Sequence, residues 1–210
     1  MQLMSFVLHI DQHLAEFLKD YGMWIYAILF LIIFVETGLV VMPFLPGDSL
    51  LFAAGALAAF TGELNPALLI GLLFVAAVLG DTLNYHIGRH LGGKIFEMDS
   101  RWINQQHLKN TQDFFAKHGG KTIIFARFLP FARTFAPFVA GAGKMDYRYF
   151  ISYNIIGGFC WIASFVLLGY FFGNQPVMKE NFTYVIFGII IFSVLPVVIG
   201  FIRSKFKKSK

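Results

Sequence analysis

Apolar residues form long runs along this chain, and the breaks between the runs divide it into segments. Residues 66–91 and 147–172 are each long enough, at about 1.5 Å per helical residue, to cross a hydrocarbon core of about 30 Å. Residues 182–202 form a further run of this length. The pattern predicts full membrane spans at these positions, in an all-α protein that crosses the membrane several times.

Two other apolar stretches are interrupted where a continuous helix would be expected. The stretch 36–60 breaks at Pro46 and Gly47, and the stretch 122–143 breaks at Pro130. Prolines remove helical hydrogen bonds, and charges or unsatisfied backbone groups facing lipid cost several kcal/mol. Each stretch is therefore predicted to be a re-entrant helical hairpin. A second proline in the later hairpin, Pro137, belongs to the same broken region.

The N-terminal region has a different pattern. Residues 1–22 alternate apolar and polar side chains at three- and four-residue spacing, which predicts an amphipathic helix on the membrane or against the bundle. The apolar run 23–45 follows. It either crosses the membrane or forms a long arm of the first hairpin, and the sequence leaves both open.

The distribution of charged residues predicts which side of the membrane each segment faces. The 210-residue chain has a formal net charge of +5, but its cations lie at the ends of apolar runs, which argues against nucleic-acid binding. Residues 94–121 form a polar, basic segment, interpreted as a cytoplasmic linker and not as a second domain. The tail 203–210 carries five cations and no acid, so the positive-inside rule places the C-terminus in the cytoplasm.

Short motifs occur twice and predict an internal repeat, with one copy in 23–93 and the other in 122–173. A unit of one hairpin and one span crosses the membrane an odd number of times, so the second copy should be inverted. The two breaks should then meet near mid-bilayer. The repeated motifs are Phe44-Leu45-Pro46 with Phe128-Leu129-Pro130, Ala54-Gly55-Ala56 with Ala140-Gly141-Ala142, and Gly88 and Gly92 with Gly169 and Gly173.

The same residues resemble the DedA (VTT-domain) family of bacterial inner-membrane proteins over nearly the whole chain. The resemblance implies two re-entrant hairpins in an inverted arrangement. It also implies a transporter or flippase that depends on the proton-motive force, moving undecaprenyl phosphate or glycerophospholipids in envelope homeostasis, with functional roles for Glu36, Asp48, Arg127 and Arg133. It rests on Glu36-Thr37-Gly38, Phe44 to Ser49, Gly80-Asp81 to Gly88-Arg89, and Phe125-Ala126-Arg127 with Pro130, Arg133, Pro137, Ala140-Gly141 and Met145.

The chemistry of these four residues supports a lipid-phosphate site independently. Arg127 and Arg133 flank the second break, and the planar arginine fork suits phosphate oxygens. Glu36 and Asp48 flank the first break, and a carboxylate that alternates between wet and dry surroundings takes up and releases protons. The hypothesis is that protons bound at Glu36 or Asp48 release the arginines to the lipid phosphate. The alternative is that the four residues form buried salt bridges that only hold the hairpins together.

Other polar residues within the spans have two interpretations. Asp81, Asn84 and Tyr85 recur at helical spacing and either line the translocation path or form an interhelical hydrogen-bond cluster. Asn154 is expected to form a hydrogen bond between two helices, and it is a weaker candidate for lining the translocation path.

No metal, cofactor or covalent chemistry is predicted. His86 and His90 are one helical turn apart, but no third ligand lies near them in the sequence. The single cysteine, Cys160, gives no disulfide and is expected to pack in the core. No nucleophile or carboxylate cluster accompanies the arginines, which argues against an enzyme.

The remaining alternative is a cation/proton antiporter or channel, which also uses carboxylates at the midplane. An antiporter or channel of this kind has no anionic substrate for the arginines to bind, and their positive charges would repel the transported cations. The expected partners are membrane lipids with an anionic phosphate, and protons. Formation of a homo-oligomer is left open.

Overall fold

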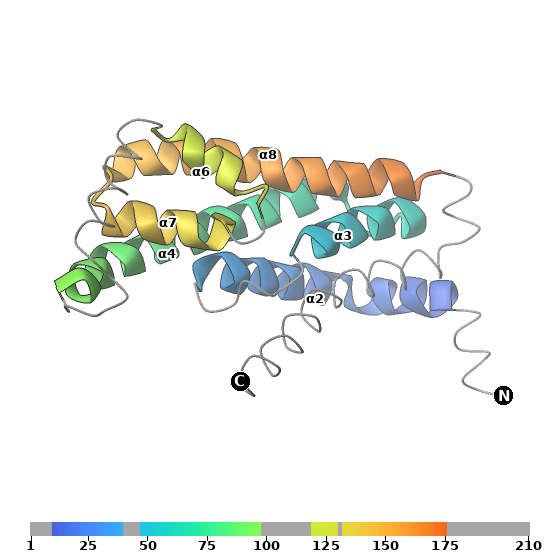
Figure 1. The fold of residues 1–210 in the computed structure, drawn as a ribbon. Helices are drawn as coiled ribbons and strands as arrows, with labels where there is room; N and C mark the ends of the chain where they lie inside the picture. The colour runs from blue at the N-terminus through green and yellow to red at the C-terminus, as the bar shows by residue number, and fades with distance from the viewer. Residues whose placement is uncertain (1–9, 40–46, 98–118, 130–131, 176–210) are drawn as a thin grey trace, which may run out of the picture. The chain divides into compact units, whose positions relative to one another are not determined.

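The structure is a computed structural model that describes residues 10–39, 47–97, 119–129 and 132–175 (Figure 1). Every regular element in these ranges is a helix, which confirms the all-α prediction for this part of the chain. The helices are α2 (Ile10–Gly38), α3 (Gly47–Thr61), α4 (Pro66–Glu97), α6 (Lys121–Ala126), α7 (Ala132–Ala142) and α8 (Tyr147–Gly173).

Several predicted features lie outside the described residues. They are the last span at 182–202, the basic tail at 203–210, the breaks at Pro46 and Pro130, and most of the linker at 94–121.

Three of the described helices are long and apolar enough to cross a membrane. Two of these candidate spans, Pro66–Leu91 and Tyr147–Gly173, coincide with spans expected from the sequence. The third, Tyr21–Gly38, lies within α2, which continues unbroken past residue 22, where the amphipathic helix was expected to end. In contrast, α3 has only 15 residues and covers about 22 Å.

Local signals explain where the helices begin and end. The side chain of Asn65 accepts hydrogen bonds from the first turn of α4, and Pro66 occupies the first helical position, which tolerates proline. Gly62 follows α3 with a φ of 71°, the left-handed conformation that commonly ends helices. Asp146 caps α8 by accepting hydrogen bonds from the backbone N–H groups of Arg148 and Tyr149, at 2.9 and 3.1 Å.

The long helices expose large apolar side chains on one face and bury small or polar residues on another. On α4 the exposed residues are Leu68, Val75, Leu79 and Leu83, whereas Ala76, Ala77, Asp81 and Asn84 are buried. This distribution fits a helix between lipid and a packed interior. Cys160 is exposed on α8, so the expectation that it packs in the core is wrong.

The helices belong to two compact units. Unit 1 contains residues 10–28 of α2, α3, residues 66–70 of α4 and residues 163–173 of α8. Unit 2 contains residues 29–38 of α2, residues 71–97 of α4, α6, α7 and residues 147–162 of α8.

In unit 1, α3 packs directly against the backbone of α8. A Cβ atom on Gly55 would lie 2.1 Å from the carbonyl oxygen of Val166, and one on Gly169 would lie 2.0 Å from that of Phe52. The two glycines therefore permit an approach that a larger residue would prevent.

Unit 2 contains the matching contact between α7 and α4. A Cβ atom on Gly141 would lie 2.0 Å from the carbonyl oxygen of Tyr85, and one on Gly88 would lie 2.1 Å from that of Phe138. Gly141 and Gly88 occupy the motif positions that correspond, in the repeat predicted from the sequence, to Gly55 and Gly169. Each unit thus uses the equivalent pair of repeated glycines for its own helix contact.

Replacing Gly88 by alanine should destabilise the protein by about 1–3 kcal/mol or more, because the new methyl group has to displace the backbone of α7. Gly71, also in α4, supplies the control, because a Cβ atom added there would have no neighbour within 4 Å. Its replacement by alanine should be neutral or stabilise by up to about 1 kcal/mol. Unfolding of the full chain in detergent measures both. Equal stability of the two variants would contradict the close contact.

Candidate functional site

Glu36 and Arg133 form a buried ion pair in unit 2. Glu36 lies in the last turns of α2 with 0% of its side chain exposed, and Arg133 lies in the first turn of α7 with 6% exposed. The Nη2 atom of Arg133 donates a hydrogen bond to Oε1 of Glu36. The pair joins residues that are 97 positions apart in the sequence.

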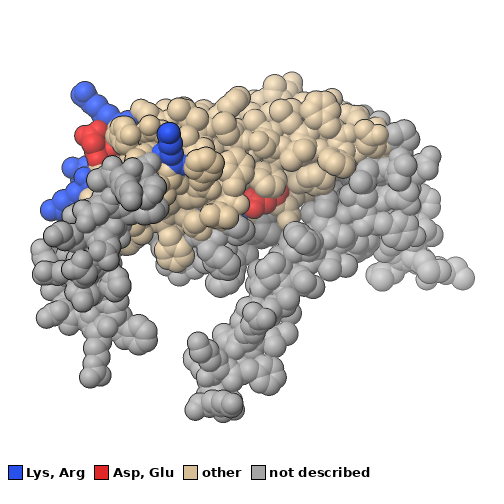
Figure 2. Space-filling model, turned by 45° about the horizontal axis from the view of Figure 1, so that its top comes forward, with Lys and Arg blue, Asp and Glu red and all other residues tan. Residues whose placement is uncertain are grey.

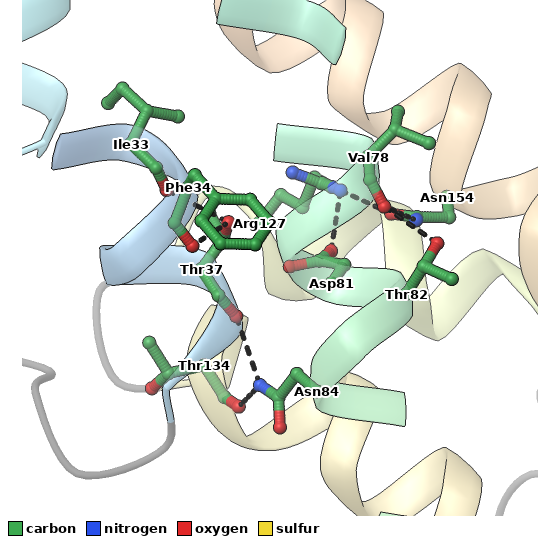
Figure 3. Close-up of polar contacts among 10 residues, drawn as sticks. All are labelled: Ile33, Phe34, Thr37, Val78, Asp81, Thr82, Asn84, Arg127, Thr134 and Asn154. Atoms are coloured by element: carbon green, nitrogen blue, oxygen red, sulfur yellow. Dashed lines mark hydrogen bonds and ion pairs between the residues drawn. The ribbon is translucent and has the colours of Figure 1, made fainter. Parts of the chain in front are cut away.

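Arg127 and Asp81 form a second buried pair in the same unit (Figure 3). Arg127 follows the last residue of α6, and its Nη2 atom lies 2.5 Å from Oδ2 of Asp81 on α4. The same Nη2 atom donates to Oδ1 of Asn154 on α8. Asn154 in turn donates to the carbonyl oxygen of Val78, at 3.3 Å, so α4, α6 and α8 meet at this arginine.

Asn84 joins α2 and α7 within unit 2. Its Nδ2 atom donates to the carbonyl oxygens of Thr37 on α2 and Thr134 on α7, at 3.1 and 2.7 Å (Figure 3). Its side chain is fully buried, and its Oδ1 atom has no hydrogen-bond partner among the described residues. A buried amide that bridges two backbones in this way fixes the position of the segments that carry Glu36 and Arg133.

Trp161 brings the two ion pairs into one cluster. Its fully buried ring lies 5.8 Å from the guanidinium carbon of Arg127 and 5.1 Å from that of Arg133. An aromatic face attracts cations, so the indole helps to hold two positive groups close together. We call the set of Glu36, Asp81, Arg127, Arg133, Asn154 and Trp161 the charged cluster.

Small residues let α8 approach the arginine. Gly157 and Gly158 lie between Asn154 and Trp161, and a Cβ atom on Gly158 would lie 3.4 Å from Nη2 of Arg127. A Cβ atom on Gly157 would lie 3.1 Å from Cα of Ile124 on α6. The position of Arg127 between α4 and α8 thus depends on helix packing as well as on charge.

The other described candidates lie on the following elements. Tyr85 packs in an apolar group with Ile123, Ala140 and Phe150, and its hydroxyl donates to the carbonyl oxygen of Met145. Pro137 is buried inside α7, and Gly47 and Asp48 begin α3 in unit 1. Among the predicted residues described in unit 2, those that come together are Glu36, Asp81, Asn84, Arg127, Arg133 and Asn154.

Trp161 and the two threonine carbonyls were not identified from the sequence. Trp161 is seven residues after Asn154 and therefore lies on the same face of α8, which was an available signal. The backbone acceptors at Thr37 and Thr134 have no signal in the sequence. Within the described residues, no group of three or more His, Cys, Asp or Glu side chains is arranged to hold a metal ion.

The sequence matches a known domain family and several known proteins. The VTT domain matches residues 45–171. The chain is 55% identical to protein DedA of Escherichia coli K12 over 205 residues, which cover 97% of this chain and 94% of the relative. An uncharacterized membrane protein of Mycobacterium leprae is 45% identical over 170 residues, covering 80% and 76% of the two chains.

A more distant relative is named as an inner membrane protein. The inner membrane protein YqjA of Escherichia coli K12 is 35% identical over 159 residues, covering 74% of this chain and 71% of the relative. No solved structure matches the chain. Together with the apolar helices, these matches show that the chain is a membrane protein of the DedA family, which carries the VTT domain.

Proposed function

We propose that this protein moves a lipid phosphate, such as undecaprenyl phosphate or a glycerophospholipid, across the bacterial inner membrane in a process driven by the proton-motive force. The observation that carries the proposal is the charged cluster, in which two arginines and two carboxylates are buried together. Buried charges in membrane proteins generally mark substrate or proton pathways, because lipid solvates them poorly.

The arginines supply the phosphate recognition in this proposal. Each guanidinium presents N–H groups in a planar fork, which matches two phosphate oxygens at once. Arg127 and Arg133 flank one short break and share one tryptophan. Two forks held close together suit a single headgroup better than two separate anions.

The carboxylates supply the proton coupling. Glu36 is bound to Arg133 in the structure, so it competes with a phosphate for that arginine. A proton on Glu36 removes its charge and weakens its hold on the arginine, which then becomes available to the lipid. Asp48, in the first turn of α3, is the second proposed proton-coupling residue, as the resemblance to the family implies.

The arrangement of the helices supports two re-entrant hairpins in an inverted repeat. A helix of 15 residues such as α3 is shorter than a hydrocarbon core of about 30 Å, and α7 is shorter still with 11 residues. The repeated glycines form equivalent helix contacts in units 1 and 2. An inverted pair of hairpins that enter from opposite faces would bring both breaks to the membrane midplane.

Surface charge supports the proposed orientation, with the C-terminus in the cytoplasm. Figure 2 shows Lys and Arg gathered on one side of the visible face, whereas most of the remaining described surface is uncharged. The exposed cations among the described side chains of unit 2 belong to segments that the positive-inside rule assigns to the cytoplasm. They are Arg89, Lys121, Lys144 and Arg148.

The experiment that tests this function measures headgroup accessibility in vesicles containing the purified full-length protein. Undecaprenyl phosphate and common phospholipids are compared, each with and without a pH gradient. We expect faster movement of a lipid phosphate when the protein is present, and a further increase when the gradient is imposed.

The same vesicles distinguish the competing function. A cation/proton antiporter predicts sodium or potassium flux coupled to the gradient and no change in lipid accessibility. Clear ion flux without any lipid movement would therefore replace the carrier proposal with the antiporter. The carrier involves no covalent step, so the lipid recovered afterwards should be chemically unchanged.

A further inference from the structure

Asp81 stands in the same relation to Arg127 as Glu36 does to Arg133. In both pairs the Nη2 atom of the arginine donates to one carboxylate oxygen, and all four side chains are at most 6% exposed. Both arginines also attract Asp81 electrostatically. The charged cluster therefore contains two positive and two negative groups, and its net charge is zero.

The geometry of Arg127 shows where a phosphate would bind. Nε and Nη2 form the edge of a guanidinium that binds two oxygens side by side. In Arg127, Nη2 is bound by Asp81 and Asn154, whereas Nε is buried and has no hydrogen-bond partner among the described residues. A phosphate that used the whole edge would occupy Nε and would compete with the Asp81 oxygen at Nη2.

A phosphate monoester that enters this neutral cluster brings about 1.5 to 2 negative charges. Burying uncompensated charge is strongly unfavourable, and the described neighbours of Asp81 offer no third cation. The described groups that interact with Asp81 are Arg127 after α6 and Arg133 on α7. These arginines in turn contact Glu36 on α2 and the uncharged Asn154 and Trp161 on α8. Within the described part of unit 2, the carboxylates of Glu36 and Asp81 are able to remove the excess negative charge by taking up protons.

We propose that Asp81 is a second proton-accepting residue of this site, so that a phosphate monoester dianion is carried together with two protons, one on Asp81 and one on Glu36. This inference rests on the proposed function. Each proton forms an O–H bond on a carboxylate, whose arginine then donates to the phosphate. When the phosphate leaves, the protons dissociate on the opposite side and both ion pairs form again.

The wild-type protein provides the first test. Vesicles with a pH-sensitive dye in the lumen report protons moved per lipid moved, for two lipids of different charge. We expect about two protons per undecaprenyl phosphate, a monoester, and about one per phosphatidylglycerol, whose diester carries about one charge. Equal ratios for the two lipids would overturn the inference.

The Asp81→Asn variant provides the second test, with Thr82→Val as its matched control. The hydroxyl of Thr82 donates its hydrogen bond to the carbonyl oxygen of Val78 and carries no charge. We expect Asp81→Asn to lower the ratio for undecaprenyl phosphate to about one, and Thr82→Val to leave it at about two. A ratio of about two in Asp81→Asn would remove Asp81 from the proton pathway.

The two proposals fail in different ways. If the wild-type protein moves no phosphate lipid, the proposed function itself is wrong. If it moves the lipid with proton coupling, but the ratio does not depend on lipid charge, only the inference about Asp81 is wrong. The comparison of lipids needs no variant, so it remains decisive even if Asp81→Asn does not fold.

Discussion

Replacing Arg133 by lysine should reduce movement of the lipid phosphate at least about tenfold, which corresponds to about 1.4 kcal/mol, while the protein still inserts and folds. Lysine keeps the positive charge opposite Glu36, so the buried pair remains neutral. It loses the planar fork and therefore cannot hold two phosphate oxygens in one plane. The measurement compares headgroup accessibility in vesicles that contain equal amounts of wild-type and variant protein.

Arg148→Lys is the matched control for this substitution. Arg148 is exposed at the start of α8 and lies outside the charged cluster, so its replacement should leave transport unchanged. If Arg133→Lys is fully inserted and transports lipid as fast as the wild-type protein, Arg133 does not bind the phosphate through two parallel hydrogen bonds.

Removing Glu36 alone should destabilise the protein much more than removing it together with Arg133. Glu36→Leu removes the Glu36 carboxylate from the buried guanidinium of Arg133, and we expect a loss of about 3–5 kcal/mol in the free energy of unfolding. The double variant Glu36→Leu/Arg133→Met removes both charges. It should recover most of the lost stability, because apolar pairs of similar volume often replace buried ion pairs at little cost. Unfolding in detergent measures both variants.

Transport by the double variant then separates a functional site from a structural clamp. If the ion pair only holds the helices together, a stable double variant should still move lipid. Our proposal predicts that it is stable and inactive, since both a phosphate-binding group and a proton-accepting group are gone. Retained transport in a stable double variant would favour the clamp.

The helical organisation was largely predictable from the sequence, because span length and apolar periodicity depend on local composition. The expected spans at 66–91 and 147–172 coincide with apolar stretches of α4 and α8. Likewise, the charges beside the helix breaks marked Glu36, Arg127 and Arg133, since an ionisable group in an apolar run has to find a partner.

The pairing of these charges was not predictable, because it depends on which helix faces meet. Asp48 was expected to act with Glu36, since both flank the first break. Within unit 2 the structure pairs Arg127 with Asp81. Asp81 lies inside a candidate span, and its position in the sequence is consistent both with lining the path and with interhelical hydrogen bonding. Trp161 was missed for a similar reason, because a tryptophan in an apolar helix normally indicates core packing.

The duplicated motifs likewise do not reveal which helices pack together. The duplicated Ala-Gly-Ala motifs predicted equivalent roles for Gly55 and Gly141, but the sequence contains no information on which helix each one contacts. In the structure Gly55 meets α8 and Gly141 meets α4. In both contacts a glycine lies against the backbone of another helix. The identity of that helix is known only from the structure.

The most direct test of phosphate recognition is lipid binding to the purified protein, measured with undecaprenyl phosphate and with undecaprenol, the alcohol that has the same chain and no phosphate. We predict that the wild-type protein binds the phosphate at least about tenfold more tightly, a difference of about 1.4 kcal/mol. Arg133→Lys should lose this preference and keep the weaker binding of the chain. Equal affinity of the wild-type protein for the two lipids would contradict the assignment of the arginines to the phosphate.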